Sequence, residues 1–396
     1  MRITFLTHFP GQGGSTVLLL QLKRFLESRG HAISVVVGED SDSALIPDYQ
    51  VVPRTASPGN RDRLRLYLQW VQRTKPDLVY TISGTEESNL LRFLRIPRVL
   101  HVSSLEQHEY LDVPFRLRQL QAYTECRTAN TPDVLMRICP ADGGVLQGFT
   151  APYLLNPCFA SSPDTIGGTG SFDTDPISVC FVGRLETFQK RVHWLPQIVK
   201  QCQRSGRNLE WHIYGSGPWE RRFCEALKEN GSAESVRFHG WLEAEGLAKR
   251  LAKADLFFLC SRWEGLPIAM AEAMLCGLAC VVPAIPAGIT HVLRTGGGWL
   301  YDATSPARCA DALLKATEDR AIIQRKKTEA QRIARAMFAR QTVEEQLSRL
   351  ETGLKTLSFN GNVLDVGKAP RMRAVRAPVW LRRQLLALVR RVRKNY

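Results

Sequence analysis

The sequence predicts an α/β protein in which two doubly wound, Rossmann-like domains face each other across a cleft and a basic helical tail follows them. Three observations predict this fold. The chain has 396 residues, which is more than one ordinary hydrophobic core accommodates. Short apolar runs alternate with helical patterns in both halves, as in parallel sheets covered by helices. A stretch rich in Pro, Gly, Ser and Thr, residues 157–176, separates the two halves.

The N-terminal half begins with an expected strand over residues 2–6, followed by a glycine-rich turn. Ser15 is a candidate cap for a helix over residues 15–29, and Gly30 follows that helix as a stop signal. A second strand lacks polar alternation, which is typical of a strand covered on both faces. This strand and the two expected after it are residues 32–37, 78–82 and 98–102.

A second series of strands begins directly after the linker. The expected strands, with helices between them, are residues 177–182, 209–214, 236–238, 255–260 and 279–282. The chain therefore divides into a first domain, a linker, a second domain, a helix crossing back to the first domain and a tail, at residues 1–156, 157–176, 177–338, 339–357 and 358–396. Ligands of doubly wound sheets bind beyond the carboxyl ends of the strands, so the facing domains place a binding cleft between them.

The composition is that of a globular protein, with 44% hydrophobic and 23% charged residues. Pro10 and the glycines after it interrupt the first apolar run, which leaves no room for a secretory signal. No segment approaches the roughly 20 apolar residues that span a bilayer, so the expected location is cytoplasmic. Ten scattered cysteines suit reduced thiols. Cys276 and Cys280 form the only close pair, and with no second pair at zinc-finger spacing we expect no metal site.

The net charge of +15 is concentrated in the tail. Ten basic and no acidic residues lie between Lys368 and Tyr396, which leaves +5 for the rest of the chain. Residues 379–396 would form a basic amphipathic helix with Trp380 at its interface, and such a helix suits an anionic membrane surface on the cytoplasmic face. The alternatives are a helix docked on the protein itself or a nucleic-acid-binding arm. The nearly neutral body makes nucleic acid the weaker hypothesis.

The stretch EGLPIAMAE, Glu264 to Glu272, carries the strongest functional signal. Pro267 suits the first position of a helix, whose free amides would point toward the strand ends and bind hydroxyls or phosphate oxygens. The helical neighbours of Glu272 three and four positions away are all apolar. A carboxylate on such a face is costly unless it accepts hydrogen bonds, and a ribose diol would donate two. The alternative is a glutamate that extends to solvent at the edge of the helix.

Two cations follow the first strand of the second domain. Gly183 allows the chain to turn at the strand end, and Arg184 and Lys190 then place two positive charges near one point. A leaving diphosphate requires such neutralisation when no metal is present. Solvated charges at a domain edge are the alternative interpretation.

Further glycines follow other strands. Gly215 and Gly217, the glycines of GSGP, come directly after the expected strand 209–214, and Gly240 comes at the end of the next strand. In the first domain, Gly13 and Gly14 follow the first strand and could bring backbone amides to an anionic group. Gly215, Gly217 and Gly240 are also consistent with turn chemistry alone. The stretch PGQGGS, which contains Gly13 and Gly14, is neither the dinucleotide fingerprint GxGxxG nor a P-loop.

Taken together, these motifs resemble glycosyltransferase family 4, whose members are retaining enzymes of GT-B fold. The resemblance runs in order over residues 1–355. It rests on GQGGS, LESRGHAISVVV, PDLVY, FVGRLETFQKR, IYGSGP, RFHGW and EGLPIAMAEAMLCGLACVV.

The resemblance implies a role for each matching residue. Arg184 and Lys190 would bind the donor diphosphate, Glu272 the ribose, and Glu264 the donor sugar. Backbone contacts to that sugar would come from Gly265, Leu266 and Pro267, with Gly183 and Gly215 also at the nucleotide. Gly13 and Gly14 would approach the sugar phosphate from the first domain, which would also bind the acceptor. Such enzymes need neither a metal nor another cofactor, and they are thought to react by front-face attack.

The chain departs from the family pattern at two places. Many members carry a histidine after the strand that follows PDLVY, but the aligned residue here is Ser103, flanked by His101 and His108. Lys190 is followed by Arg191, where glycine is commoner. Asp173 and Asp175 form a DxD pattern like that of metal-binding glycosyltransferases of another fold, but in this linker we interpret them as turn residues.

The expected function is therefore retaining transfer of a hexose-type sugar from a nucleotide sugar to a glycan or lipid-linked acceptor of the cell envelope. UDP is the expected nucleotide because it is the commonest in the family. Two alternatives remain: a nucleotide-sugar 2-epimerase of the same fold, and a catalytically inactive nucleotide-binding module.

Overall fold

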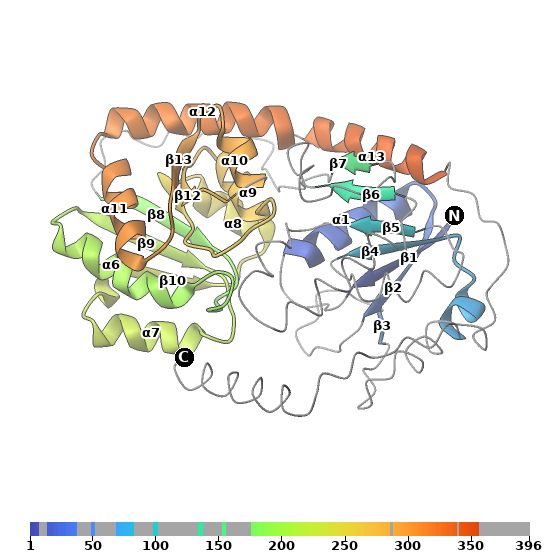
Figure 1. The fold of residues 1–396 in the computed structure, drawn as a ribbon, viewed down its shortest axis with the longest axis horizontal. Coiled ribbons are helices and arrows are strands. Elements are labelled where there is room, and N and C mark those ends of the chain that lie inside the picture. The colour runs from blue at the N-terminus through green and yellow to red at the C-terminus, as the bar shows by residue number, and fades with distance from the viewer. Residues whose placement is uncertain are drawn as a thin grey trace, which may run out of the picture.

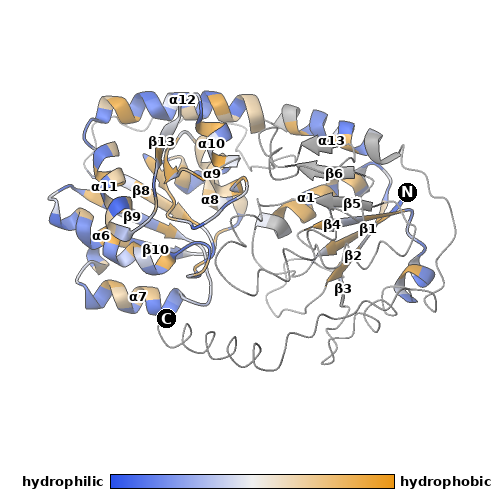
Figure 2. Cartoon of the chain, in the orientation of Figure 1, coloured by the Kyte–Doolittle hydropathy of each residue, from blue (hydrophilic) through white to orange (hydrophobic). Residues whose placement is uncertain are grey.

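A computed structural model describes residues 1–7, 14–37, 49–51, 69–82, 98–101, 134–137, 153–155, 176–285, 288–338 and 340–355. Within these residues the chain forms two parallel sheets, each flanked by helices (Figure 1). Figure 2 shows hydrophobic residues on several strands of each sheet, while most of the helices carry both hydrophobic and hydrophilic residues. The prediction of two doubly wound domains is confirmed.

The first sheet has seven described strands, in the order β3-β2-β1-β4-β5-β6-β7. Their bounds are Arg2–Thr7 (β1), Ala32–Val37 (β2), Tyr49–Val51 (β3), Leu78–Ile82 (β4), Arg98–His101 (β5), Val134–Arg137 (β6) and Tyr153–Leu155 (β7). Every strand pairs in parallel with its neighbours. Helix α1 (Gly14–Ser28) buries Leu18, Leu19, Leu22 and Leu26 in this core.

The second sheet has six described strands, in the order β10-β9-β8-β11-β12-β13. Their bounds are Ile177–Val182 (β8), Leu209–Tyr214 (β9), Val236–Gly240 (β10), Leu256–Phe258 (β11), Ala279–Pro283 (β12) and Gly298–Tyr301 (β13). The helices that accompany it are α6 (Leu195–Arg204), α7 (Glu220–Glu229), α8 (Ala244–Leu251), α9 (Ile268–Leu275), α10 (Gly288–Leu293), α11 (Pro306–Ala316) and α12 (Arg320–Phe338), with short 3₁₀ turns at Val192–Trp194 and Ala233–Ser235. Both sheets reverse their strand order beside their first strand, and this switch point lies between β8 and β11 in the second sheet.

Helix α13 (Arg340–Lys355) continues from α12 and packs on the first sheet's core through Val343, Leu347 and Leu350 (Figure 1). The two halves also touch through α9, whose Ile268 packs against the same core. A Cβ atom added at Gly14 would lie 3.7 Å from Ile268 Cδ1. The first turns of α1 and α9 therefore face each other between the two sheets.

Several element boundaries differ from the predictions. The strand predicted at residues 255–260 is shorter, because β11 covers only Leu256–Phe258. The helix predicted at 15–29 is shifted by one residue to Gly14–Ser28. In β2, which was predicted to be covered on both faces, only Val35–Val37 are buried. Strands β3, β6, β7 and β13 were not predicted. The domain boundaries stay predictions, and the basic tail and most of the linker lie outside the described residues. Among the helices of the described residues, none is both long enough and apolar enough to cross a membrane.

Candidate functional site

The predicted cations and the first glutamate of the Glu-x7-Glu stretch lie on two loops that follow neighbouring strands. Gly183 and the residues after it follow β8, and Ser261 to Glu264 follow β11. The two strands pair in parallel, with Val179 opposite Leu256. Their carboxyl ends therefore meet at the same edge of the sheet, which is its topological switch point and the usual ligand position in such folds.

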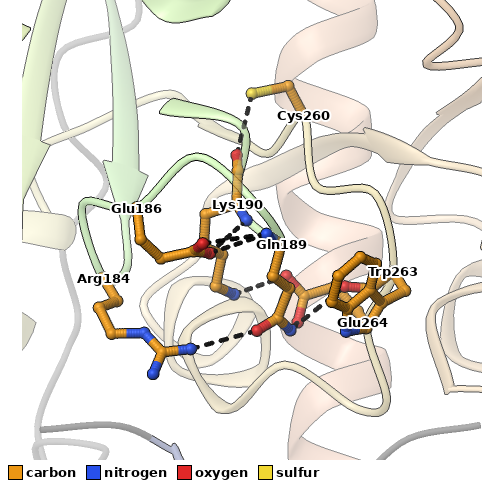
Figure 3. A network of polar contacts seen from close by, with 7 residues as sticks. All are labelled: Arg184, Glu186, Gln189, Lys190, Cys260, Trp263 and Glu264. Atoms are coloured by element: carbon orange, nitrogen blue, oxygen red, sulfur yellow. Dashed lines mark hydrogen bonds and ion pairs between the residues drawn. The ribbon is translucent and has the colours of Figure 1, made fainter. Parts of the chain in front are cut away.

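Lys190 and Glu264 form an ion pair at this edge (Figure 3). Lys190 Nζ lies 2.5 Å from Glu264 Oε1, and the two side chains are only 13% and 5% exposed. The sequence placed both residues in one site but did not predict that they contact each other. Because each charge is largely withdrawn from water, each depends on the other for compensation.

Arg184 is exposed and contacts the same network through Gln189. Its Nη2 donates to Gln189 Oε1 at 3.3 Å. The amide nitrogen of Gln189 in turn donates to the Trp263 carbonyl at 3.3 Å and to Glu264 Oε2 at 3.4 Å. The structure thus brings Arg184, Lys190 and Glu264 together, with Gln189 between them (Figure 3).

The loop that carries Lys190 is shaped by the carboxylate of Glu186. This carboxylate accepts from the backbone amides of Phe188 at 2.7 Å, Gln189 at 3.0 Å and Lys190 at 2.6 Å. Hydrogen bonds from amides to a carboxylate are charge-assisted and stronger than neutral ones. On the far side of the loop, the Cys260 thiol lies 3.5 Å from the Lys190 carbonyl, to which it donates. Burial raises the pKa of the Cys260 thiol, so it remains protonated and able to donate.

Arg191 occupies the place where the family pattern favours glycine, and its backbone explains that preference. Its φ is 51°, in the left-handed region that most side chains avoid. Two contacts hold the side chain: Nη1 donates to the Ala303 carbonyl at 2.6 Å, and the guanidinium lies 4.3 Å from the Trp194 ring centroid. These contacts offset the strain, so the turn keeps its shape without glycine.

The glycines at the strand ends allow two backbones to approach closely. Gly215 has φ 132°, and a Cβ added there would collide with the Gly183 carbonyl oxygen. A Cβ at Gly217 would lie 2.5 Å from the Leu185 carbonyl oxygen. The Leu185 amide also donates to the Ser216 carbonyl at 2.8 Å. Packing alone therefore accounts for Gly215 and Gly217, and a ligand-binding role for Gly183 and Gly215 stays a prediction.

Helix α9 differs slightly from its prediction. Pro267 precedes the helix as its N-cap residue, with φ −65° and ψ 116°, instead of occupying the first helical position. The Pro267 carbonyl accepts from the Met270 amide at 3.0 Å. Gly265 lies in the loop before the helix, where its carbonyl contacts the backbone of Gly288. Leu266 is half-buried and packs against the core of the second sheet.

Glu272 is half-buried in the middle of α9. Leu275 and Cys276, three and four residues later, are buried as the sequence indicated. The pKa of the Cys276 thiol is raised to about 12, mainly by burial and further by the negative charge of Glu272. Glu272 thus lies beside an apolar surface while remaining partly accessible, as a ribose ligand would need to be.

The contribution of the first domain is described only in part. Gly14 begins α1 and faces Ile268 at the start of α9, whereas Gly13 lies outside the described residues. His101 is the last residue of β5. Ser103 and His108, like Asp173 and Asp175 of the linker, lie outside the described residues.

Sequence patterns alone did not reveal Glu186, Gln189 or Cys260 as parts of this site. Their only signal was their position in FVGRLETFQKR and at the end of the β11 run.

Comparison with known proteins supports a glycosyltransferase. Residues 176–319 match the family model described as "Glycosyl transferases group 1". The putative colanic acid biosynthesis glycosyltransferase WcaL of Salmonella typhimurium is 27% identical over 183 residues, which are 44% of this chain and 45% of that protein. Amylovoran biosynthesis glycosyltransferase AmsK of Erwinia amylovora is 28% identical over 153 residues, 37% of each chain. The matches span less than half the length of these relatives, and they support a glycosyltransferase.

Two solved structures cover nearly the whole chain. Sucrose-phosphate synthase from Thermosynechococcus elongatus has a TM-score of 0.71 at 18% identity, over 90% of this chain and 99% of the other. HepE from Anabaena in complex with UDP and glucose has a TM-score of 0.68 at 18% identity, over 90% and 100%. At such identities the likeness shows the fold, which is the GT-B arrangement of two Rossmann-like domains.

Proposed function

We propose that the protein is a glycosyltransferase of family 4 that moves a hexose-type sugar, with retention of configuration, from a UDP-sugar to a glycan or lipid-linked acceptor of the cell envelope. The observation that carries the proposal is the ion pair between Lys190 and Glu264 beside Arg184, at the switch point of the second sheet. This arrangement offers two cations for a diphosphate. It also offers the Glu264 carboxylate, in direct contact with Lys190, as an acceptor for sugar hydroxyls.

In this proposal the donor diphosphate lies against Arg184 and Lys190, and the ribose diol donates to Glu272. The arriving diphosphate competes with Glu264 for Lys190. Glu264 then accepts hydrogen bonds from the donor sugar, with backbone contacts from Gly265, Leu266 and Pro267. Gly13 and Gly14 approach the same phosphate from the first domain. Positive charge placed where negative charge develops in the transition state is the largest catalytic contribution we expect.

The reaction breaks the bond between the anomeric carbon and the β-phosphate oxygen. The acceptor oxygen forms its bond to that carbon on the same face, and its proton passes to the leaving phosphate. Arg184 and Lys190 stabilise the departing diphosphate, so the protein's own residues supply the charge that a metal would otherwise supply.

The relatives support the class of acceptor, because the names of WcaL and AmsK place them in the biosynthesis of two bacterial polysaccharides. HepE was crystallised with UDP and glucose, which supports UDP as the nucleotide here. A cytoplasmic location with the tail on an anionic membrane completes the proposal. The intact chain is expected to sediment with anionic vesicles, whereas a chain ending near Lys368 is not; equal sedimentation would remove the membrane from the proposal.

Donor hydrolysis in EDTA tests the central proposal. The purified protein should slowly release free sugar and UDP from at least one UDP-sugar in the presence of EDTA, and the Glu264→Gln variant should lose this activity while keeping its circular dichroism spectrum. An inactive binding module would bind UDP without turnover. A 2-epimerase would release an altered sugar, which chromatography of the products identifies.

A further inference from the structure

We infer that Gln189 is a positioning residue that joins the diphosphate end of the donor site to its sugar end. The inference rests on the proposed function and adds a residue to it. Gln189 lies within the stretch FVGRLETFQKR, between Arg184 and Lys190, but it is neutral and the family resemblance implies no role for it.

The amide group of Gln189 has a different partner on each side (Figure 3). Its Oε1 accepts from Arg184 Nη2 at 3.3 Å, while its Nε2 donates to Glu264 Oε2 at 3.4 Å and to the Trp263 carbonyl at 3.3 Å. Rotating the amide by half a turn would direct an NH₂ group at a guanidinium and an oxygen at a carboxylate. The partners therefore fix a single orientation.

The backbone of Gln189 is hydrogen-bonded as well as its side chain. Its amide donates to Glu186 Oε2 at 3.0 Å, and its carbonyl accepts from the Arg262 amide at 2.7 Å. The second bond joins the loop after β8 directly to the loop after β11. Gln189 is thus tied to both loops through main chain and side chain, and it has little freedom to follow a displaced partner.

This arrangement matters because Arg184 and Glu264 act on opposite sides of the bond that breaks. In the proposed complex, Arg184 binds the diphosphate and Glu264 binds the sugar. A neutral amide can accept from the cation and donate to the carboxylate at once, which holds the two groups at a fixed separation. Without it, Glu264 loses the hydrogen bond to its second oxygen, and the carboxylate is held less firmly once the diphosphate competes for Lys190.

Binding of UDP compared with binding of a UDP-sugar separates positioning from a general structural effect. The variants are Gln189→Ala and Gln189→Met, of which the second preserves most of the volume. Gln201→Ala is the matched control, because Gln201 Nε2 donates to a carboxylate, Asp311 Oδ1, at 3.0 Å on the exposed side of the domain. Titration calorimetry measures the Kd of UDP and of UDP-glucose, UDP-galactose and UDP-N-acetylglucosamine. The UDP-sugar that binds the wild type most tightly is then compared with UDP in every variant.

We expect both Gln189 variants to bind UDP within about threefold of wild type, because Arg184, Lys190 and Glu272 remain. Their affinity for the UDP-sugar should fall by about tenfold more than their affinity for UDP, as for loss of one hydrogen bond to a charged group. Gln201→Ala should change neither. Gln189→Glu should show a larger loss for the UDP-sugar, since it repels Glu264.

Equal weakening for UDP and the UDP-sugar in the Gln189 variants, or no weakening of either, would overturn the inference while leaving the proposed function intact. A wild type that binds UDP but none of the sugars, or binds nothing, would instead overturn the proposed donor, and the inference with it. A variant whose melting temperature falls well below that of Gln201→Ala is replaced by the other Gln189 variant for the comparison.

Discussion

Glu264 and Glu272 are eight positions apart in one motif, yet the structure places them in different surroundings. Glu264 is 5% exposed, lies in a loop and is paired with Lys190. Glu272 is half-buried on a helix, beside the apolar Leu275 and Cys276. The same Glu-x7-Glu spacing therefore contains two different kinds of carboxylate. Glu264 is part of a packed charged network, whereas Glu272 is a half-buried residue in the middle of a helix.

The largest expected effect is at Glu264. Replacing it with alanine leaves Lys190 buried without its partner, which should lower the free energy of unfolding by about 3–5 kcal/mol. Glu264→Gln retains an oxygen for Lys190 and should fold, but donor turnover should fall by about 10²-fold or more. Urea denaturation and product assays measure the two effects.

The Lys190→Met, Glu264→Ala double variant is the control for this interpretation. It should be less destabilised than the sum of the two single variants, because neither charge remains buried alone. Additive losses would show that the ion pair contributes nothing to the fold, and the contrast with Glu272 would then lose its basis.

Glu272→Gln should separate the two carboxylates. Because Glu272 is half-buried on α9, the free energy of unfolding should change by less than about 1 kcal/mol. The affinity for UDP should fall by about tenfold, since a neutral amide accepts the ribose hydroxyls more weakly than a carboxylate. A loss of stability as large as that of Glu264→Ala, with unchanged UDP affinity, would reverse the assignment of roles.

Gly288→Ala should displace the loop that carries Glu264 and leave Glu272, in the middle of α9, in place. An added Cβ would collide with the Gly265 carbonyl oxygen and lie 3.0 Å from Leu266 Cα, so the loop before α9 must shift. We expect a loss of about 1–3 kcal/mol in the free energy of unfolding and slower donor turnover. Gly246→Ala in α8 is the matched control, because no atom lies within 4 Å of its added Cβ. This control should gain up to about 1 kcal/mol. Equal behaviour of the two variants would show that the loop tolerates displacement.

Arg191→Gly should have the smallest effect. Glycine removes the strain of φ 51°, about 1–2 kcal/mol, but the contacts of Arg191 with Ala303 and Trp194 are lost. These changes oppose each other, so the net change in unfolding free energy should stay within about 1 kcal/mol, with unchanged UDP affinity. A large drop in UDP affinity would mean that Arg191 itself contacts the ligand.

The sequence predicted the longer strands well, because their apolar residues either follow one another or alternate with polar ones over five or six positions. Residues 177–182 and 209–214 match β8 and β9, and residues 78–82 match β4. Strands such as β3 and β7 span three residues each and carry no pattern that a window of sequence can detect. They exist because neighbouring strands offer them a pairing partner, which is information held by the whole fold.

The sequence placed Arg184, Lys190 and Glu264 at one site, but it predicted neither their contacts nor the other members of the network. Lys190 and Glu264 are 74 positions apart, and only the pairing of β8 with β11 brings them together. Gln189 carries no charge, and the family resemblance implies no role for it, so nothing in its residue type distinguished it from a solvent-exposed loop residue. Spacing can indicate which groups share a sheet edge, whereas hydrogen bonds depend on local backbone geometry such as the left-handed turn at Arg191.

The decisive measurement is a crystal structure of the protein with UDP bound. We expect the ribose hydroxyls within hydrogen-bond distance of the Glu272 carboxylate and the diphosphate in contact with Arg184 and Lys190, with Glu264 beside the β-phosphate. UDP bound away from the loops after β8 and β11, or bound there with its ribose turned away from Glu272, would contradict this expectation.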